Sequence, residues 1–169
     1  NGQSHAINKG FAKANGRVLT WLNSDDVLMP GALGKVAAAW NSMSNTENFW
    51  IAGGVVWLDA DDRIIQLRQA RTFFKPLVSR GLQGVFGPSS FMGRELLERF
   101  GALDESFHYM MDTELWIKLS RNEVRYTTVP GYMWGLRLHA EAKMSGHNFS
   151  GSAMSSHDHP VWVKRENER

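Results

Sequence analysis

The feature that most constrains this chain is a short apolar run that ends abruptly on two adjacent carboxylates. Residues 17–23 contain four large apolar side chains, which is typical of a buried strand covered on both faces. Turn-forming residues, Asp25 and Asp26 among them, end the run, and Pro30 then stands where a helix tolerates proline, in its first turn. The pattern predicts a strand, an acidic turn and a helix. Ligands of open α/β sheets bind outside the carboxyl ends of strands, so this turn is the first candidate for a site.

The composition excludes several classes of protein. With 169 residues, 43% of them hydrophobic, the chain can fill the core of one domain. A formal net charge of +2 does not by itself imply nucleic acid, and zero cysteines exclude disulfides and thiolate metal sites. No apolar stretch approaches the roughly 20 residues of a membrane span, and residues 1–16 lack the apolar core of a signal peptide. A cytoplasmic domain is expected.

Hydrophobic periodicity predicts an α/β chain. Apolar residues at helical spacing predict four helices: 4–15, 31–44, 94–100 and one that Asp112 precedes and that ends near Asn122. Alternation and β-branched or aromatic runs predict strands over 49–58, 63–67, 89–93, 124–129 and 132–139. The turn at 59–62 would join the first two of these strands as a hairpin, and 68–90 would be loops with short elements. Residues 146–169 are interpreted as a weakly structured tail or an exposed helix.

Adjacent carboxylates such as Asp25 and Asp26 can hold a hard divalent cation through one or two oxygens. A Mg²⁺ or Mn²⁺ ion so held keeps coordination positions open for the phosphates of a substrate. The competing interpretation is that one of the two acids caps the helix that starts near Pro30. The acids at 59–62 lack the glycine and the distal glutamate of a calcium loop, and a hairpin turn explains them better.

Asp112 is the second candidate because it stands at the start of a helix, with Glu114 and Trp116 after it. An acid at this place can project from the scaffold and take a proton from a hydroxyl nucleophile. The competing interpretation is an ordinary helix cap. The helix dipole would favour the ionised carboxylate unless burial opposes it.

A third cluster contains Arg137 and His139. Strand alternation would place both on one face, where they could neutralise a diphosphate, with His139 as a metal ligand. Two polar residues on a solvated strand face are the simpler alternative. The later histidines, His147, His157 and His159, are assigned to the tail and to no site.

Taken in order, these blocks resemble the family 2 glycosyltransferases, inverting enzymes that use nucleotide-diphospho sugars. The matching blocks are residues 2–11, 14–26 with its continuation 30–33, 90–97 with 101–106, 112–116, and 137–139 with Ser145. Five blocks in order over about residues 1–145 identify the family. The resemblance implies an α/β protein with a partial GT-A fold, a mixed β-sheet flanked by helices.

On the donor side the resemblance assigns roles to four residues of the acidic turn and the closing block. Asp26 would be the main ligand of a divalent metal, Mg²⁺ or Mn²⁺, and Asp25 would face the ribose or assist the metal. Arg137 and His139 would attend the diphosphate and the metal. Two further residues of the first block, Asn8 and Lys9, are assigned to binding the nucleotide-diphospho sugar.

On the acceptor side the resemblance makes Asp112 the general base on the acceptor hydroxyl. Glu114 and Trp116 would shape the acceptor pocket, which would take a saccharide or a lipid-linked saccharide. One base, one metal and a single displacement at the anomeric carbon then suffice, without a covalent intermediate. A lipid-linked acceptor would place the protein at the membrane surface.

The sequence departs from the family pattern in three respects. His5 stands where the family usually has Asp, and Met111 stands where the Glu of its Glu-Asp pair would be. The first two βα units of the family, which hold the nucleotide base, would precede Asn1. The expectation is therefore a catalytic domain over 1–145 that lacks its N-terminal nucleotide-binding part, followed by a tail over 146–169.

Two alternatives to an active transferase stay open. A non-catalytic remnant could fold and form a homodimer through the sheet edge that the missing strands would leave exposed. A metal-dependent phosphoesterase could use Asp25, Asp26 and His139, although a second dense cluster of metal ligands is lacking in the sequence.

Overall fold

The computed structural model describes residues 2–82, 84–140 and 142. Contacts between residues divide the chain into two compact units, Asn1–Arg137 and Leu138–Arg169. The first unit contains every helix and strand found among the described residues. The predicted domain boundary after residue 145 and the predicted tail lie outside the described residues and stay predictions.

A mixed β-sheet forms the centre of the first unit. Its strands are β1 (Val18–Leu19), β2 (Val27–Leu28), β3 (Trp50–Leu58), β4 (Ile64–Arg68), β5 (Ser90–Gly93) and β6 (Thr127–Arg137). The order is β1-β5-β3-β6-β2, and β4 pairs with the second half of β3. The long pair β3 and β6 is parallel, whereas the other pairs are antiparallel. The expectation of a mixed sheet flanked by helices is confirmed.

β3 is the central strand of the sheet, and both of its faces are covered. All nine residues are buried, and alternate side chains enter two different cores, with Trp50 in one and Ile51 in the other. Gly53 allows β6 to pack closely here, since a Cβ on Gly53 would lie 1.9 Å from Cγ of Met133. Larger residues at this position would force the two central strands apart.

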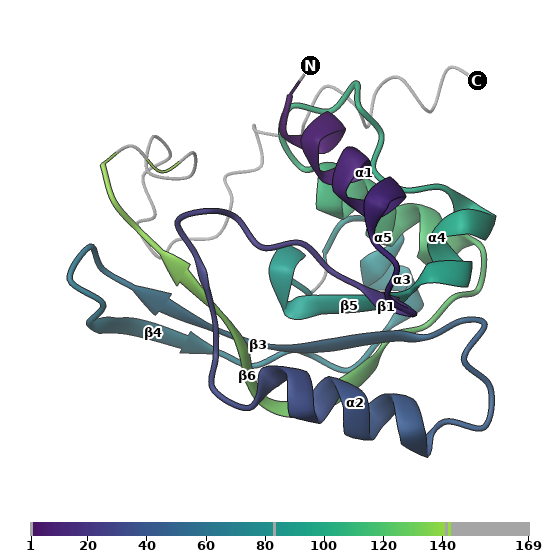
Figure 1. Ribbon diagram of the computed structural model, residues 1–169, viewed down its shortest axis with the longest axis horizontal. Helices are drawn as coiled ribbons and strands as arrows, with labels where there is room; N and C mark the ends of the chain where they lie inside the picture. The colour runs from purple at the N-terminus through teal and green to yellow at the C-terminus, as the bar shows by residue number, and fades with distance from the viewer. Residues whose placement is uncertain (1, 83, 141, 143–169) are drawn as a thin grey trace. The chain divides into compact units, whose positions relative to one another are not determined.

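Helices cover both faces of the sheet (Figure 1). The short helix α3 and three longer helices lie on one face: α1 (Gln3–Lys13), α3 (Lys75–Val78), α4 (Arg94–Phe100) and α5 (Met111–Arg121). The opposite face carries α2 (Ala32–Ser42), which buries Ala32 and Val36 against the second core. Among the described residues, no helix is long and apolar enough to cross a bilayer.

Three stacked tryptophans form the base of the larger core. The rings of Trp50 and Trp116 lie 4.9 Å apart at an interplanar angle of 24°, and Trp116 lies 6.3 Å from Trp21 at 21°. Trp50 donates from Nε1 to Oγ of Ser90 at 2.6 Å. Because Trp21 belongs to the segment that carries Asp25 and Asp26, this stack connects that segment to the sheet and to α5.

Most of the elements predicted from periodicity are confirmed, with ends that shift by one or two residues. The hairpin at 59–62 is confirmed as well: Oδ1 of Asp59 accepts the backbone N–H groups of Asp61 and Arg63, both at 2.9 Å. The short elements expected within 68–90 are α3 and a 3-10 turn, η1 (Gly87–Ser89).

Three predicted strands differ in extent from those observed. The strand expected over 17–23 is reduced to two residues, because the chain leaves β5 after Leu19, and Leu22 is 43% exposed rather than buried. The strands expected over 124–129 and 132–139 are one strand, β6. Gly131, at φ +89°, absorbs a bulge against β3 instead of ending the strand.

Candidate functional site

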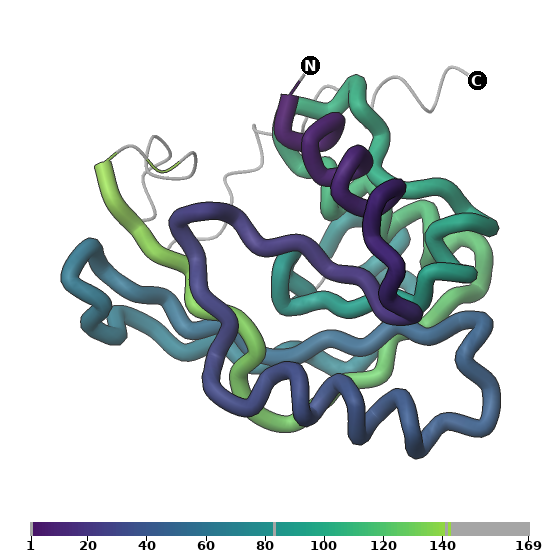
Figure 2. Tube along the Cα trace, in the orientation of Figure 1, coloured from purple at the N-terminus to yellow at the C-terminus, as the bar shows by residue number. Residues whose placement is uncertain are grey.

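The acid turn, residues 23–26, lies at the carboxyl ends of the parallel strands β3 and β6. β1 and β2 stand at opposite ends of the sheet order, so the connection between them has to cross the sheet, as the long blue-purple stretch of Figure 2 shows. β2 then pairs antiparallel with β6, with Val27 opposite Gly135. This register brings Asp26 next to Arg137, the last residue of β6.

Asp26 is the most buried acid of this turn. It is 6% exposed, and its two oxygens accept hydrogen bonds from the backbone N–H of Arg137 at 3.0 Å and from Nδ2 of Asn23 at 2.7 Å. Burial raises the pKa of the Asp26 carboxyl above its ordinary value, the two hydrogen bonds oppose that rise, and the neighbouring charge of Asp25 adds to it. A cation at this carboxylate would offset the cost of its burial.

Arg137 connects three acidic residues. Its Nη1 donates to the backbone oxygen of Asp25, while Nε and Nη2 donate to Oδ1 of Asp62 at 2.9 and 2.7 Å. Asp62 sits in the β3–β4 hairpin turn with a positive φ of 63°. The hairpin therefore reaches the end of β6 and orients the guanidinium beside the acid turn.

Asn23 connects the acid turn to the first helix. Its Oδ1 accepts from Nε2 of Gln3 at 3.0 Å while its Nδ2 binds Asp26. The sequence predicts Asn23 and Asp62 only as turn residues. Their positions in the sequence do not indicate that Asn23 contacts Gln3 and Asp26 or that Asp62 contacts Arg137.

The carboxylates of the acid turn suit a single hard cation with an open coordination sphere. Each oxygen of Asp26 accepts one N–H and keeps further lone pairs, and Asp25 is half-buried next to it. Among the described residues, no group of three or more His, Cys, Asp or Glu side chains could hold a metal. Two carboxylates with phosphates and water completing the shell match the preference of Mg²⁺.

His139 does not share a strand face with Arg137, which corrects the sequence prediction. β6 ends at Arg137, and His139 lies two residues further on, in the second unit. The assignment of His139 as a metal ligand stays a prediction.

Asp112 is the second residue of α5, and the cap of that helix is Met110. The helix-cap interpretation of Asp112 is therefore wrong. Its Oδ1 accepts the backbone N–H of Thr113 at 2.7 Å. A Cβ on Gly87 would lie 3.3 Å from Oδ2 of Asp112 and 2.9 Å from Cζ2 of Trp21, so a glycine lets η1 pack closely against both.

Burial dominates the ionisation of Asp112. It raises the pKa of the carboxyl above the ordinary value, while hydrogen bonds from backbone N–H groups, among them those of Thr113 and Gly87, act in the opposite direction. The sequence predicts an ionised acid at this helix start unless burial opposes the effect of the helix dipole. Burial does oppose it, and a raised pKa suits a base that works near neutral pH.

The two residues assigned to the acceptor pocket have different surroundings. Glu114 is half-buried, with Oε2 3.7 Å from Nζ of Lys118, which also donates to the backbone oxygen of Ala102 at 2.8 Å. Trp116 is fully buried in the tryptophan stack. Trp116 therefore has no exposed surface with which to line a pocket. Its ring instead packs against Trp21, in the segment that leads to the acid turn.

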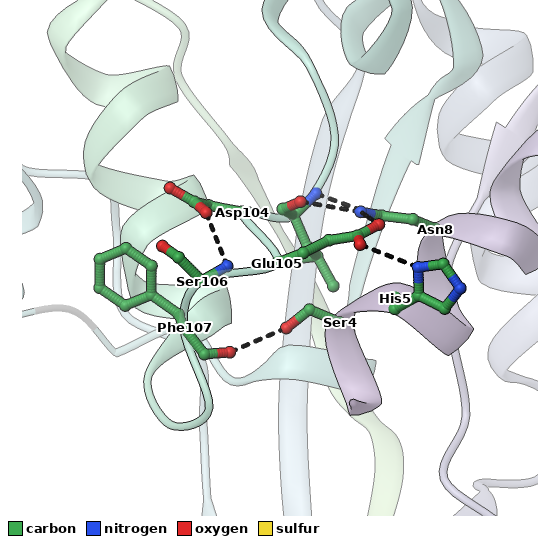
Figure 3. Close-up of polar contacts among 8 residues, drawn as sticks. Ser4, His5, Asn8, Asp104, Glu105, Ser106 and Phe107 are labelled. Carbon is green, nitrogen blue, oxygen red and sulfur yellow. Dashed lines mark hydrogen bonds and ion pairs between the residues drawn. The ribbon is translucent and has the colours of Figure 1, made fainter. Parts of the chain in front are cut away.

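Asn8, one of the two donor-site residues predicted in the first block, holds a loop rather than facing the acid turn. Asn8 donates from Nδ2 to the backbone oxygen of Leu103 at 2.8 Å and accepts the N–H of Leu103 at Oδ1 at 3.1 Å (Figure 3). Its amide group is thus engaged in joining α1 to the loop before α5. Lys9 is exposed on the same helix. This placement does not support a donor-binding role for Asn8.

His5 and Met111, the two departures from the family pattern, both contact this region. Nδ1 of His5 lies 2.8 Å from Oε2 of Glu105, whose other oxygen accepts from Asn8 at 3.1 Å (Figure 3). Sδ of Met111 lies 3.0 Å from Oγ of Ser4, which also donates to the backbone oxygen of Phe107. α1 therefore remains fastened to the loop that leads into Asp112.

Comparison with known proteins gives one family and a set of solved structures. A family model described as "Glycosyltransferase like family 2" matches residues 1–156. A crystal structure of S. aureus TarS is similar over 81% of this chain and 24% of that chain, with 14% identity and a TM-score of 0.58. A structure of S. aureus TarS 1-349 gives 14% identity, 81% and 40% coverage, and a TM-score of 0.56. Comparison with curated proteins gives no significant match.

Proposed function

We propose, from the premise that this chain belongs to the glycosyltransferase-like family 2, that it transfers a sugar from a nucleotide-diphospho sugar to an acceptor hydroxyl with inversion. Its mixed sheet flanked by helices matches part of the GT-A fold. The chain spans about a quarter of the longer TarS chain and 40% of the shorter one. The observation that carries the proposal is the placement of Asp26, Asp25 and Arg137 together at the carboxyl ends of β3 and β6.

On the donor side, the acid turn and Arg137 would hold the diphosphate. Asp26 would be the main ligand of a divalent cation and Asp25 the second. When bound, Mg²⁺ or Mn²⁺ would stabilise the negative charge that develops on the departing nucleoside diphosphate. The guanidinium of Arg137 already lies at this turn, fixed by Asp62 and by the backbone oxygen of Asp25, and it can contribute N–H donors to phosphate oxygens.

On the acceptor side, Asp112 would act as the general base. Its carboxylate takes the proton of the acceptor hydroxyl, the freed oxygen forms a bond to the anomeric carbon, and the bond from that carbon to the diphosphate breaks. A single displacement of this kind inverts the configuration. Burial supplies the raised pKa that makes Asp112 a stronger base than an exposed aspartate.

The two alternatives have less support in the structure. A phosphoesterase that uses a dense metal cluster is disfavoured by the described residues, which contain no group of three metal-ligating side chains. A remnant that dimerises through the sheet edge at β1 would pair a strand of two residues, which lies at one end of the sheet order. Such a short strand is a poor template for pairing.

The proposal is tested by measuring nucleoside diphosphate release from a panel of nucleotide-diphospho sugars, with saccharide and lipid-linked saccharide acceptors and Mn²⁺. We expect release that requires both the acceptor and the metal and that stops when the metal is chelated. Equal release of phosphate from simple phosphoesters would favour the phosphoesterase. Failure of the whole panel, together with no metal-dependent nucleotide binding, would favour the remnant.

A further inference from the structure

Three large apolar side chains are exposed around the short helix α3. Phe74 is 58% exposed, Leu77 is 42% exposed and Leu82 is 59% exposed. We call these three residues the α3 patch. Neither the acid turn nor Asp112 involves any of them, and water-exposed apolar groups of this size cost free energy unless something covers them.

Backbone hydrogen bonds hold the α3 patch together. The N–H of Leu82 donates to the oxygen of Leu77 at 2.9 Å, and the N–H of Gly81 donates to the oxygen of Val78 at 3.0 Å, with Gly81 at φ +76°. These two bonds form a Schellman motif, which brings the side chains of the paired first and last residues side by side. Val78 is 1% exposed and anchors the turn in the core. The backbone that carries Leu77 and Leu82 is therefore held in a defined conformation.

All charged residues in the sequence around the α3 patch are cations. From residue 63 to residue 94 the chain contains no Asp or Glu. Lys75 and Arg80 belong to α3 and the turn after it, and the backbone N–H of Arg71 donates to the oxygen of Gly84, two residues after Leu82, at 3.3 Å. Nη1 of Arg80 donates to the backbone oxygen of Pro76 at 2.7 Å, which keeps its guanidinium at the turn. Lys75 pairs with Glu123, which lies outside this segment, so the positive charge of Lys75 is partly matched.

We propose that the α3 patch docks the protein on an anionic lipid surface. Apolar side chains at the tip of a turn can enter the headgroup and acyl boundary, while cations around them bind anionic headgroups. The positive segment complements a negatively charged leaflet. The patch is carried by a helix of four residues and the turn that follows it, so its exposed side chains can enter a lipid boundary from one turn of the chain. This inference does not depend on the transfer reaction, since binding can be measured without turnover.

Sedimentation with lipid vesicles tests the docking. The parent protein should bind vesicles that contain phosphatidylglycerol and should bind pure phosphatidylcholine vesicles far more weakly, with the difference reduced at high salt. Arg71→Gln with Arg80→Gln should weaken binding by about 25-fold, because each cation near an anionic surface contributes about fivefold. Phe74→Ser with Leu77→Ser should weaken binding to a comparable degree.

Matched control variants remove the same chemistry elsewhere on the molecule. Leu33→Ser deletes a leucine that is 61% exposed on α2, and Lys13→Gln with Arg99→Gln removes two exposed cations of α1 and α4. These variants should bind the anionic vesicles as the parent does. Thermal unfolding followed by circular dichroism establishes that every variant compared is folded.

Three results would overturn the proposal. The first is absence of binding to either kind of vesicle by the folded parent. The second is parental binding by both α3 patch variants. The third is a parent that sediments as a dimer while Phe74→Ser with Leu77→Ser sediments as a monomer, without vesicle binding by either, since a second copy of the chain would then cover the patch.

Discussion

Replacing Asp112 with asparagine should lower sugar transfer by about 10²- to 10⁴-fold, the range that a general base contributes, while leaving the fold intact. Asparagine keeps the size and the hydrogen-bonding acceptor of the side chain but cannot take the acceptor proton. The backbone N–H of Thr113, which donates to Oδ1 of Asp112 at 2.7 Å, can donate to the amide oxygen of the asparagine instead. We therefore expect α5 to begin at the same residue. The measurement is nucleoside diphosphate release under the conditions given above, with metal-dependent nucleotide binding as the control. Transfer at the parental rate would end the assignment of Asp112.

The same substitution should change the pH dependence of stability. Burial raises the pKa of Asp112 in the folded state above its ordinary value of 3.8, so the folded chain binds this proton more tightly than the unfolded chain does. The contribution is fully present below 3.8 and is lost as pH rises through the folded pKa. Asp112→Asn removes this loss, so urea denaturation at neutral pH should show the variant to be at least as stable as the parent. A clearly less stable variant would show that the carboxylate stabilises the fold.

Replacing Trp116 with alanine should cost about 3–5 kcal/mol of folding free energy, the range for deleting a large buried aromatic side chain. Trp116 is fully buried and stacks on both Trp21 and Trp50. Its loss therefore removes two aromatic contacts and leaves a cavity below the segment that leads to the acid turn. Urea denaturation gives the free energy, and near-ultraviolet circular dichroism reports the stacked indoles.

Trp40→Ala is the matched control for this large effect. Trp40 is half-buried on α2, where it packs edge-on against Phe49 at 4.9 Å and the guanidinium of Arg17 lies 5.1 Å from its ring. Its deletion should cost clearly less than the deletion of Trp116. If Trp116→Ala stayed within about 1 kcal/mol of the parent, the stack would not be the structural base of the site.

Local patterns in the sequence predicted the helices and the hairpin well, because each of these elements is specified by its own residues. Helix 94–100 ends where Gly101 permits a positive φ, and the turn at 59–62 forms around the side chain of Asp59. The strand lengths were harder to predict. β1 is short and β6 is continuous because a strand ends where its partner does, and the partners come from distant parts of the chain.

The candidate site could be predicted in its residue types but not in its contacts. Asp25, Asp26 and Arg137 do meet, as the motifs suggested. Asp62 joins them only because parallel pairing of β3 with β6 brings a hairpin turn to the end of β6, which no spacing along the chain reveals. Trp116 was predicted to shape the acceptor pocket but lies in the core. The sequence does not distinguish these two places, because a tryptophan near an acid is compatible with both.

The most direct test of this account is isothermal titration calorimetry of the chain with a nucleoside diphosphate, in the presence of Mn²⁺ and in the presence of a chelator. We expect micromolar binding that requires the metal, that disappears in Asp26→Ala, and that persists in Asp61→Ala, which removes an exposed carboxylate of the hairpin turn. Equal binding with and without Mn²⁺, or parental binding by Asp26→Ala, would contradict the assignment of the acid turn as the donor site.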